Sequence, residues 1–391
     1  MANFVQLYKS TDFNAPSLMG QVGSLTALLT TVLVTGYVTA GVGNITRASN
    51  IATVSLGTAN STLVTGNYVT IAGCAQTDYN GTFQITVINS TTFTYVVANS
   101  PATPATGTIT YKKAPLGWSV PFTGTNIAAY RSNDVASNRF YLLVNDAGGM
   151  PGGALEASVR GYESMTDVYT GIQPFPTVAQ SANGICWRKS RDVSVTTRAW
   201  TIIGDDKTFY LLTNDFASVG TSNLFGFGSF PSQKPADSFN TFLIGYTNFN
   251  TNQGSGALSH GFSAQPVVIG SATTGLYIAR PYTQLGSSFN AGICNWVQGW
   301  FGNSATLTFP HPVDGGTYLV QPIFHEVTNG FVCIRGRIPG VYHHLHGFPY
   351  NHYDQITGVT NLPGVTLTIL SFSVGTSSSG QLAFDTFGPW N

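Results

Sequence analysis

The chain has 391 residues, of which 16 are Lys or Arg and 16 are Asp or Glu, so charged side chains make up 8% against the roughly 25% of an ordinary soluble domain. Its formal net charge is +0, so no electrostatic field draws it to nucleic acid or to an anionic membrane. A dispersed monomer usually carries a net charge of about 2 to 8 and a surface about a quarter charged. We therefore expect no nucleic-acid partner and a surface that lies largely against other protein.

The cysteines and the apolar segments bear on the compartment. Cys74, Cys186, Cys294 and Cys333 form no C-x-x-C pair, so neither a zinc ribbon nor a disulfide framework is predicted. The first residues, MANFVQLYKSTDFN, lack the basic and apolar parts of a secretory signal. The most apolar stretch, Leu25 to Val34, is too short and too polar to span a bilayer. We expect synthesis in the cytoplasm, no secretory signal and no membrane insertion.

One amphipathic helix is predicted over Val22 to Leu33, where apolar residues recur at three- and four-residue spacing and Ser24 is a candidate cap. The pattern lasts under two heptads, so we expect the helix to dock on a sheet and not to form a coiled coil. Elsewhere, runs rich in Val, Ile, Thr, Tyr and Phe alternate with clusters of turn-forming residues. The predicted fold is all-β, with a multi-sheet sandwich or barrel framework and this one N-terminal helix.

Residues 38–114 have a different texture, rich in Thr, Ser, Asn, Ala and Val. Apolar residues alternate cleanly there, as at Val69 and Ile71, and Asn80 with Gly81 favours a tight hairpin turn. The sequence PATPATG then reads as a proline-stiffened exit. The segment is close to the smallest size at which a domain folds alone, and we predict an inserted immunoglobulin-like β-sandwich.

The framework around this insert comprises residues 1–37 and 115–391. Within it, residues 217–265 are loop-rich, mark a candidate subdivision and are the best candidate for long loops that reach a neighbour. Near the end, apolar residues alternate from Val365 and then, on the opposite parity, from Leu370. Such a shift of phase predicts a β-bulge.

Motifs of several enzyme classes are missing. No serine stands in a G-x-S-x-G nucleophile elbow, and Gly226 with Gly228 lacks the third glycine and the helix of a phosphate-binding loop. A glycan hydrolase needs two carboxylates across a glycosidic bond, and Asp205 with Asp206 is the only adjacent acidic pair. Because GDDK precedes a strand, we expect this pair in a solvated turn.

Two further charged groups are weaker candidates for chemistry. Glu156, Glu163 and Asp167 can share a face of a short helix, but nothing around them would stabilise an oxocarbenium ion. The basic run from Trp187 to Arg191 could grip a phosphate backbone. A solvated turn, or pairing with acids of a neighbouring subunit, is the favoured interpretation of such a run.

Histidines form a cluster with metal-ligand spacing, since four of the seven are His343, His344, His346 and His352. In a strand, His344 and His346 project to the same face, and an H-x-H pair of neutral imidazoles can ligate a transition metal. The nearby glycines and proline favour surface-loop or interface histidines instead. We predict no metal site and no cofactor, with His344 and His346 as the candidate ligands if a metal binds.

Several segments carry a resemblance. The stretch from Leu63 to Tyr111, with VTGNYVTIAGCAQTDYNGTFQ, resembles a small β-module that recurs in structural proteins of tailed bacteriophages. The framework is similar to a family of phage virion proteins in VQLYKSTDFNAP, GQVGSLTALLTTVLVTGY, GWSVPFTGTNIAAYR, MPGGALEASVRGYESMTDV, GICWRKS, DDKTFYLLT and IRGRIPGVYHHLH. In that family LVTGY runs almost directly into GW, which implies an insertion between Gly36 and Gly117. The resemblance implies a structural role.

We therefore predict a non-enzymatic structural component of a bacteriophage virion, in the tail or baseplate. Its partners would be copies of itself and other virion structural proteins, assembled symmetrically. Two alternatives stay open. One is a receptor- or glycan-binding module on the virion surface, acting through the insert or through the aromatic residues from Phe225 to Phe230. The other is a capsid decoration protein.

Overall fold

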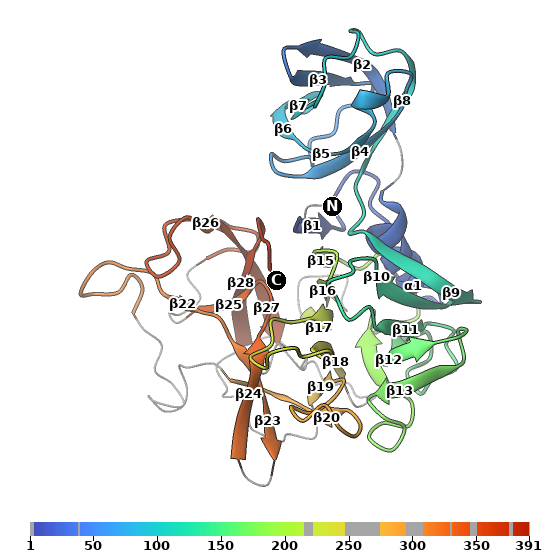
Figure 1. Cartoon of the computed structure of the whole chain (residues 1–391), viewed down its shortest axis with the longest axis vertical. Coiled ribbons are helices and arrows are strands. Elements are labelled where there is room, and N and C mark those ends of the chain that lie inside the picture. The colour runs from blue at the N-terminus through green and yellow to red at the C-terminus, as the bar shows by residue number, and fades with distance from the viewer. Residues whose placement is uncertain are drawn as a thin grey trace. The chain divides into compact units, whose positions relative to one another are not determined.

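A computed structural model describes residues 4–37, 40–214, 222–246, 274–294, 308–328, 331–344, 350–374 and 378–390. The predicted all-β, multi-sheet fold with one short helix near the N-terminus is confirmed. The chain forms two compact units (Figure 1). Unit 1 contains Met1–Leu7, Leu18–Thr26 and Gly117–Asn391, and unit 2 contains Tyr8–Ser17 and Ala27–Leu116.

The helix α1 spans Ser24–Thr30 and continues as one π-helical turn, η1, over Thr31–Thr35. It is shorter than its predicted range, but the apolar stripe is as expected, with Leu25, Leu28 and Leu29 at most 1% exposed. The first-turn N–H of Leu25 donates to Asp146 Oδ2 at 2.8 Å, while Ser24 Oγ accepts the N–H of Met19. The cap is therefore a distant carboxylate, which suits the positive end of a helix. Helices long and apolar enough to cross a bilayer are absent from the described residues.

Unit 1 is built on a 13-stranded sheet in the order β1-β15-β16-β17-β18-β14-β12-β11-β10-β9, with β13 on β12, β19 on β18 and β20 on β19. Its inner strands β15 and β16 are buried along almost their whole length. Strands that are covered on both faces read as continuous apolar runs, as in TIIG and TFYLL. The strand bounds are β1 (Gln6–Lys9), β9 (Trp118–Gly124), β10 (Ile127–Ser132), β11 (Tyr141–Asn145), β12 (Glu156–Met165), β13 (Gly171–Phe175), β14 (Ile185–Arg188), β15 (Trp200–Gly204), β16 (Thr208–Asn214), β17 (Ser222–Ser229), β18 (Thr241–Tyr246), β19 (Thr274–Ile278) and β20 (Phe289–Asn290).

Part of the stretch predicted as long loops, residues 217–265, is central sheet, so that prediction was wrong for β17 and β18. These two strands pair with each other and with β16 and β19. The glycines that suggested a loop make room for aromatic rings: a Cβ on Gly226 would lie 2.8 Å from the Tyr210 ring. The rest of the stretch lies outside the described residues.

Two smaller sheets complete unit 1, in the orders β21-β23-β24 and β22-β25-β28-β27-β26. One apolar core joins them to the large sheet, because it includes Tyr210 and Phe242 of the large sheet together with Phe324 and Phe384 of the smaller ones. The bounds are β21 (Gly292–Cys294), β22 (Leu319–Val320), β23 (Ile323–Thr328), β24 (Phe331–Arg337), β25 (Val341–His344), β26 (Gln355–Ile356), β27 (Leu367–Val374) and β28 (Ser378–Asp385).

The β-bulge predicted near Leu370 does not form. β27 pairs with β28 in unbroken register from Leu367↔Asp385 to Val374↔Ser378. Leu367 and Ile369 pack into one apolar core, whereas Leu370 packs into another. The shift of phase in the sequence therefore reflects a strand buried on both faces.

Gly340 tests how tightly the core around the C-terminal tryptophan is packed. It has a φ of +64°, and a Cβ there would lie 2.1 Å from Trp390, whereas Gly358 has a φ of +71° and open space around it. We expect Gly340→Ala to lower the free energy of unfolding by about 2 to 4 kcal/mol, through backbone strain and overpacking. Gly358→Ala should cost about 1 to 2 kcal/mol, through strain alone. Denaturant unfolding measures both, and equal losses would contradict the close packing.

Unit 2 is drawn in blue and cyan in Figure 1, and its seven strands form one sheet in the order β5-β4-β8-β2-β3-β7-β6. Only Ile85 separates the two end strands β5 and β6 in the chain, so the sheet curls toward a closed barrel around its own core. The predicted alternation is confirmed, since Val69, Ile71 and Phe93 are at most 1% exposed. The bounds are β2 (Ala40–Ala48), β3 (Ile51–Leu56), β4 (Tyr68–Cys74), β5 (Gly81–Gln84), β6 (Thr86–Asn89), β7 (Thr92–Val96) and β8 (Gly107–Lys113), with the 3₁₀ turn η2 over Thr77–Tyr79.

The tight hairpin predicted at Asn80 is wrong in detail. Asn80 has a φ of −84°, and its side chain amide bonds both the N–H and the carbonyl of Cys74 at 2.9 and 2.8 Å. The side chain thus closes a longer loop between β4 and β5. The predicted boundaries of the insert, 38–114, and its immunoglobulin-like topology stay predictions.

Candidate functional site

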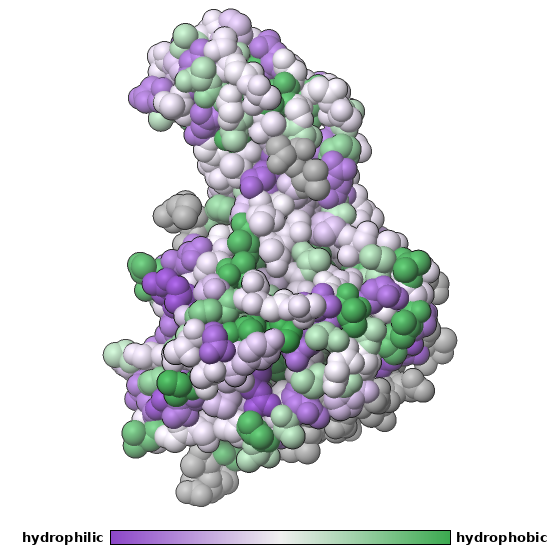
Figure 2. All heavy atoms as spheres, turned by 90° about the vertical axis from the view of Figure 1, so that its right-hand side faces the viewer, coloured by the Kyte–Doolittle hydropathy of each residue, from purple (hydrophilic) through white to green (hydrophobic). Residues whose placement is uncertain are grey.

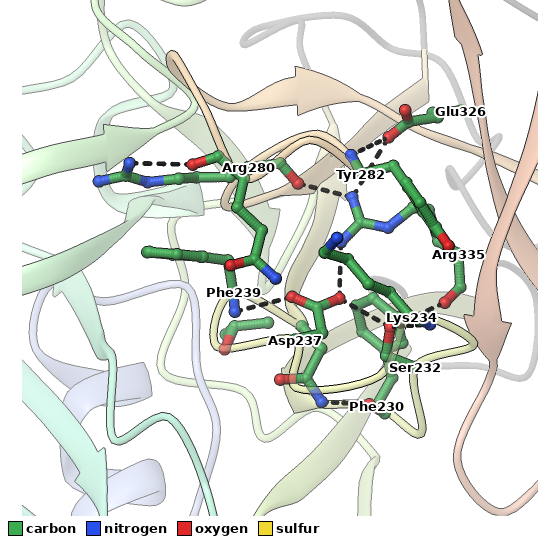
Figure 3. A network of polar contacts seen from close by, with 12 residues as sticks. Phe230, Ser232, Lys234, Asp237, Phe239, Arg280, Tyr282, Glu326 and Arg335 are labelled. Atoms are coloured by element: carbon green, nitrogen blue, oxygen red, sulfur yellow. Dashed lines mark hydrogen bonds and ion pairs between the residues drawn. The ribbon is translucent and has the colours of Figure 1, made fainter.

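A dense polar cluster surrounds Arg335 of β24 in unit 1 (Figure 3). The Arg335 side chain is fully buried, and its Nη2 lies 2.9 Å from Asp237 Oδ2. Its Nη1 lies 3.3 Å from Glu326 Oε2 and donates to the carbonyl of Arg280 at 2.6 Å. We call Arg335, Asp237, Glu326, Arg280 and Glu163 the Arg335 cluster.

The β17–β18 loop is fixed by this cluster. Asp237 Oδ2 accepts the hydroxyl of Ser232 at 2.7 Å, and its Oδ1 accepts the N–H of Phe239 at 2.9 Å. Ser232 in turn forms a β-bridge with Gly336, next to Arg335. One carboxylate therefore shapes the loop and anchors it to the smaller sheet.

The outer part of the cluster is the pair of Arg280 and Glu163. Two parallel hydrogen bonds join them, Nε to Oε1 at 2.5 Å and Nη2 to Oε2 at 2.7 Å. The guanidinium also lies 4.2 Å from the centre of the Phe239 ring. The side chains are 20% and 14% exposed, so water reaches this end of the cluster.

The charged groups of the Arg335 cluster form ion pairs with one another. Each carboxylate accepts from a guanidinium, and the other bonds go to backbone groups of the same unit and to the hydroxyl of Ser232. Arg335 Nε is the member left buried without a hydrogen-bond partner. The arrangement acts as a rigid cross-link between β23–β24, the β17–β18 loop, the chain after β19 and β12.

The basic run Trp187 to Arg191 is not a solvated turn. Two of its charges pair with acidic residues of the same chain, not with those of a neighbouring subunit. Lys189 forms an ion pair with Asp146 in which both side chains are fully buried, and its Nζ donates to the carbonyl of Gln21 at 2.7 Å. Arg188 Nη1 lies 3.7 Å from Glu156 Oε1. The prediction failed because the acidic partners lie on β12 and beyond β11, far away in the sequence.

Unit 2 contains a small pocket beside a buried ion pair of its own. Lys113 Nζ lies 2.7 Å from Asp12 Oδ2, and burial lowers the pKa of Lys113 while Asp12 opposes that shift. Asp12 Oδ1 is buried without a hydrogen-bond partner. The free volume of about 10 Å³ has room for about one water molecule. The lining residues are Asp12, Phe13, Tyr37, Asn60, Thr62, Leu63, Tyr111 and Lys113.

The candidate metal ligands are not brought together in the described residues. His344 ends β25, and His346 lies outside the described residues. In the part of the chain that the structure describes, no group of three or more His, Cys, Asp or Glu side chains is placed to hold a metal ion. The histidine pair stays a hypothesis from the sequence.

The predicted acidic candidates are scattered. Glu156 and Glu163 lie on the strand β12, not on a helix, and pair with Arg188 and Arg280. Asp167 is exposed and accepts the N–H of Tyr169 at 2.7 Å. They share no site.

Two further predictions from the sequence are wrong, because the side chains that they concern are buried. Asp205 with Asp206 does form a turn, but Asp205 is fully buried, so the turn is not solvated. Phe225, Phe227 and Phe230 are at most 1% exposed. These phenyl rings fill the core and cannot stack on a sugar ring.

The sequence interpretation missed Arg335 with Asp237 and Lys113 with Asp12. In a chain with so few charges, a charged residue inside an apolar strand such as FVCIRGR is a signal of a buried ion pair. Its partner is not readable from spacing, because Asp237 lies 98 residues away from Arg335.

Comparison with known proteins assigns the chain to no family. No family model matches the chain, and no curated protein matches it. Among solved structures, it resembles the phage phi92 endosialidase with a TM-score of 0.17 and 14% identity, over 90% of this chain and 52% of that chain. The chain thus spans about half the length of that protein, and at this TM-score neither a fold nor an active site is transferred.

The expectation of a non-enzymatic protein is corrected on this finding. One solved structure that the chain resembles is that of an enzyme, so the prediction of a non-enzymatic protein is not retained. We withdraw that prediction and assign no reaction.

Proposed function

We propose that the chain is a component of a tailed-bacteriophage particle, placed in the tail or baseplate, and that it works by assembling with copies of itself and with other particle proteins. The resemblance of VTGNYVTIAGCAQTDYNGTFQ and of the framework segments to phage virion proteins supports the particle. The observation that supports assembly is that many of the few charged side chains are buried inside the chain.

Many of the few charged side chains are turned away from the surface. Of the 16 Lys or Arg and 16 Asp or Glu residues, twelve are buried, and nearly all of these are held in ion pairs inside their own unit. Figure 2 shows a face made mostly of pale residues of intermediate hydropathy, with hydrophilic and hydrophobic residues in small separate groups. Such a surface lacks the charge that keeps monomers apart. The buried residues are Asp12, Lys113, Asp146, Glu156, Arg160, Arg188, Lys189, Arg198, Asp205, Lys207, Glu326 and Arg335.

The hairpin of β23 and β24 offers an apolar face for assembly. Val327, Val332 and Ile334 are 42%, 57% and 46% exposed. Val327 lies directly opposite Val332, and Ile334 is two residues further along, so all three share one face. Glu326 and Arg335 point to the opposite face, into the Arg335 cluster. Apolar side chains outside and charges turned inward are typical of the centre of a subunit interface, and we propose that a second copy covers this face.

A lysine on this face is expected to disrupt self-association. The unaltered chain should form oligomers at micromolar concentration, and Val332→Lys should shift it toward monomer because the charge would be buried without a partner. Val135→Lys is the matched control, since Val135 is 85% exposed and follows β10 of the large sheet, not the sheet that contains the hairpin. Light scattering measures the mass. A monomeric unaltered chain, or equal effects of both variants, would contradict the interface.

The place in the particle is tested on intact phage. Antibodies raised against the purified chain should label the tail or baseplate in electron micrographs, and mass spectrometry of purified particles should detect the chain. Labelling of the capsid alone would overturn the tail assignment, and absence from the particle would overturn the proposed function.

A further inference from the structure

The turn between β15 and β16 buries a carboxyl group that is only half satisfied. Asp205 Oδ1 accepts the N–H groups of Lys207 and Thr208 at 2.8 and 2.7 Å, which explains the turn. Its Oδ2 is buried and has no hydrogen-bond partner. The residue as a whole is 0% exposed.

Three carboxyl groups share this region with one lysine. Asp206 is half-buried, and its Oδ1 is also buried without a partner. Asp134, from the turn after β10, lies 3.5 Å from Lys207 Nζ and acts electrostatically on Asp206. Tyr210 of β16 is a further titratable group within electrostatic range of Asp205. If every acid were ionised, the lysine would leave two negative charges uncompensated.

An ionised carboxylate that is buried with one oxygen lacking a donor, and with no cation paired to it, costs several kcal/mol, so the protonated form is favoured. Burial raises the pKa of Asp205 to about 7, with a smaller contribution from Asp206, while the N–H groups of Lys207 and Thr208 oppose the shift. Burial and Asp134 also raise the pKa of Asp206. Within the described residues no metal-binding group of side chains could supply the missing positive charge.

The same turn holds two strands from the other end of the large sheet. Trp118 Nε1 donates to the carbonyl of Asp205 at 3.0 Å, and Ser132 Oγ donates to the carbonyl of Asp206 at 2.5 Å. Trp118 begins β9 and Ser132 ends β10, whereas β15 and β16 lie next to β1 at the opposite end of the strand order. The two carbonyls thus join distant parts of one curled sheet.

We propose that this turn is a proton-controlled clamp: with a proton on Asp205 it holds β9 and β10 against β15 and β16, and it loosens when the proton is lost. Loss of the proton leaves a charge on Oδ2, which has no donor, next to Asp206. The turn can relieve this charge only by opening toward water, and opening displaces the carbonyls that Trp118 and Ser132 bond.

The direction in which stability changes with pH follows from the difference between the pKa of Asp205 in the folded and in the unfolded chain. A carboxyl whose pKa is higher in the folded chain binds its proton more tightly there, so its contribution to stability is complete below the unfolded value of about 4. That contribution is lost as pH rises toward the folded value of about 7 and changes no further above it. Local loosening of the turn accompanies the last part of this change.

Hydrogen exchange of the full chain across neutral pH tests the clamp, with rates corrected for the intrinsic effect of pH. We expect protection of the Lys207 and Thr208 amides to fall by up to about tenfold per pH unit between about pH 5 and 7, and to level off above about 7, where Asp205 is ionised in both the closed and the open turn. Asp205→Asn keeps the Oδ1 acceptor and removes the ionisation of this residue, so the fall in protection should be much smaller in this variant. Asp206→Asn removes a neighbouring charge that raises the pKa of Asp205, so the fall should end at a lower pH in this variant.

Three results would overturn the clamp. They are protection in the unaltered chain that does not change with pH, the same fall in Asp205→Asn as in the unaltered chain, or a fall that ends at the same pH in Asp206→Asn as in the unaltered chain. If Asp205→Asn does not fold, the displacement by Asp206→Asn decides alone.

Discussion

Replacing Arg335 with Met is expected to lower the free energy of unfolding by about 3 to 5 kcal/mol, one of the two largest effects of a single substitution in this chain. The side chain is fully buried between Asp237 and Glu326, which are 1% and 6% exposed. Methionine fills much of the volume but leaves both carboxylates without their cation. It also frees the β17–β18 loop that Asp237 anchors.

Arg280→Met is the matched control in the same cluster. Its partner Glu163 is 14% exposed, so water can solvate the carboxylate that is left behind. We expect a loss of about 1 kcal/mol, near that of a surface pair. Urea denaturation of both variants gives the two values. If Arg335→Met cost no more than Arg280→Met, the cluster would not act as a cross-link.

Lys189→Met should cost a similar 3 to 5 kcal/mol, by a separate route, on the order measured for breaking a buried pair. Asp146 would keep the N–H of Leu25 but lose the ammonium that compensates its charge. Burial already raises the pKa of Asp146 against the opposing effect of Lys189. Without Lys189 the pKa rises further, so the variant should lose more stability as pH increases.

Two comparisons isolate the charge effect at Lys189. Arg191→Met changes the neighbouring end of the same basic run, which is half-exposed, and should alter stability by no more than about 0.5 kcal/mol. Adding Asp146→Asn to Lys189→Met keeps an acceptor for Leu25 and removes the unpaired charge, so part of the stability should return. Thermal unfolding at two pH values measures all four chains. No recovery in the double variant would mean that lost packing, and not the charge, causes the effect.

The local parts of this fold can be predicted from the sequence. The alternation at Val69, Ile71 and Phe93 follows from the two-residue period of a strand, and the stripe through Leu25 and Leu28 follows from the period of a helix. Both periods are properties of neighbouring residues. They therefore survive without knowledge of what the element packs against.

Features set by distant residues are not predictable in this way. The glycines of β17 look like loop residues until Tyr210 of β16 is placed against them. The change of phase at Leu370 looks like a bulge until a second core is placed behind β27. In both cases a tertiary contact decides between two local interpretations.

The same distinction between local and distant residues applies to the candidate site. Turn chemistry correctly predicts the turn at Asp205, yet its burial depends on Trp118 and on strands elsewhere in the sheet. The basic run at Lys189 is visible as a cluster of charges, but Asp146 lies 43 residues away. Which charges are buried is therefore a property of the topology.

The burial of so many charged side chains has a consequence for how copies of this chain attract one another. Salt acts on exposed charges, and its screening length shortens to about 10 Å at 0.1 M. With few such charges outside, added sodium chloride has little to weaken. Contact between apolar faces behaves differently: it gains strength on warming from low temperature and in the presence of excluded salts such as sulfate. If copies associate through the proposed face of β23 and β24, temperature and hydration should therefore control that association more than ionic strength does.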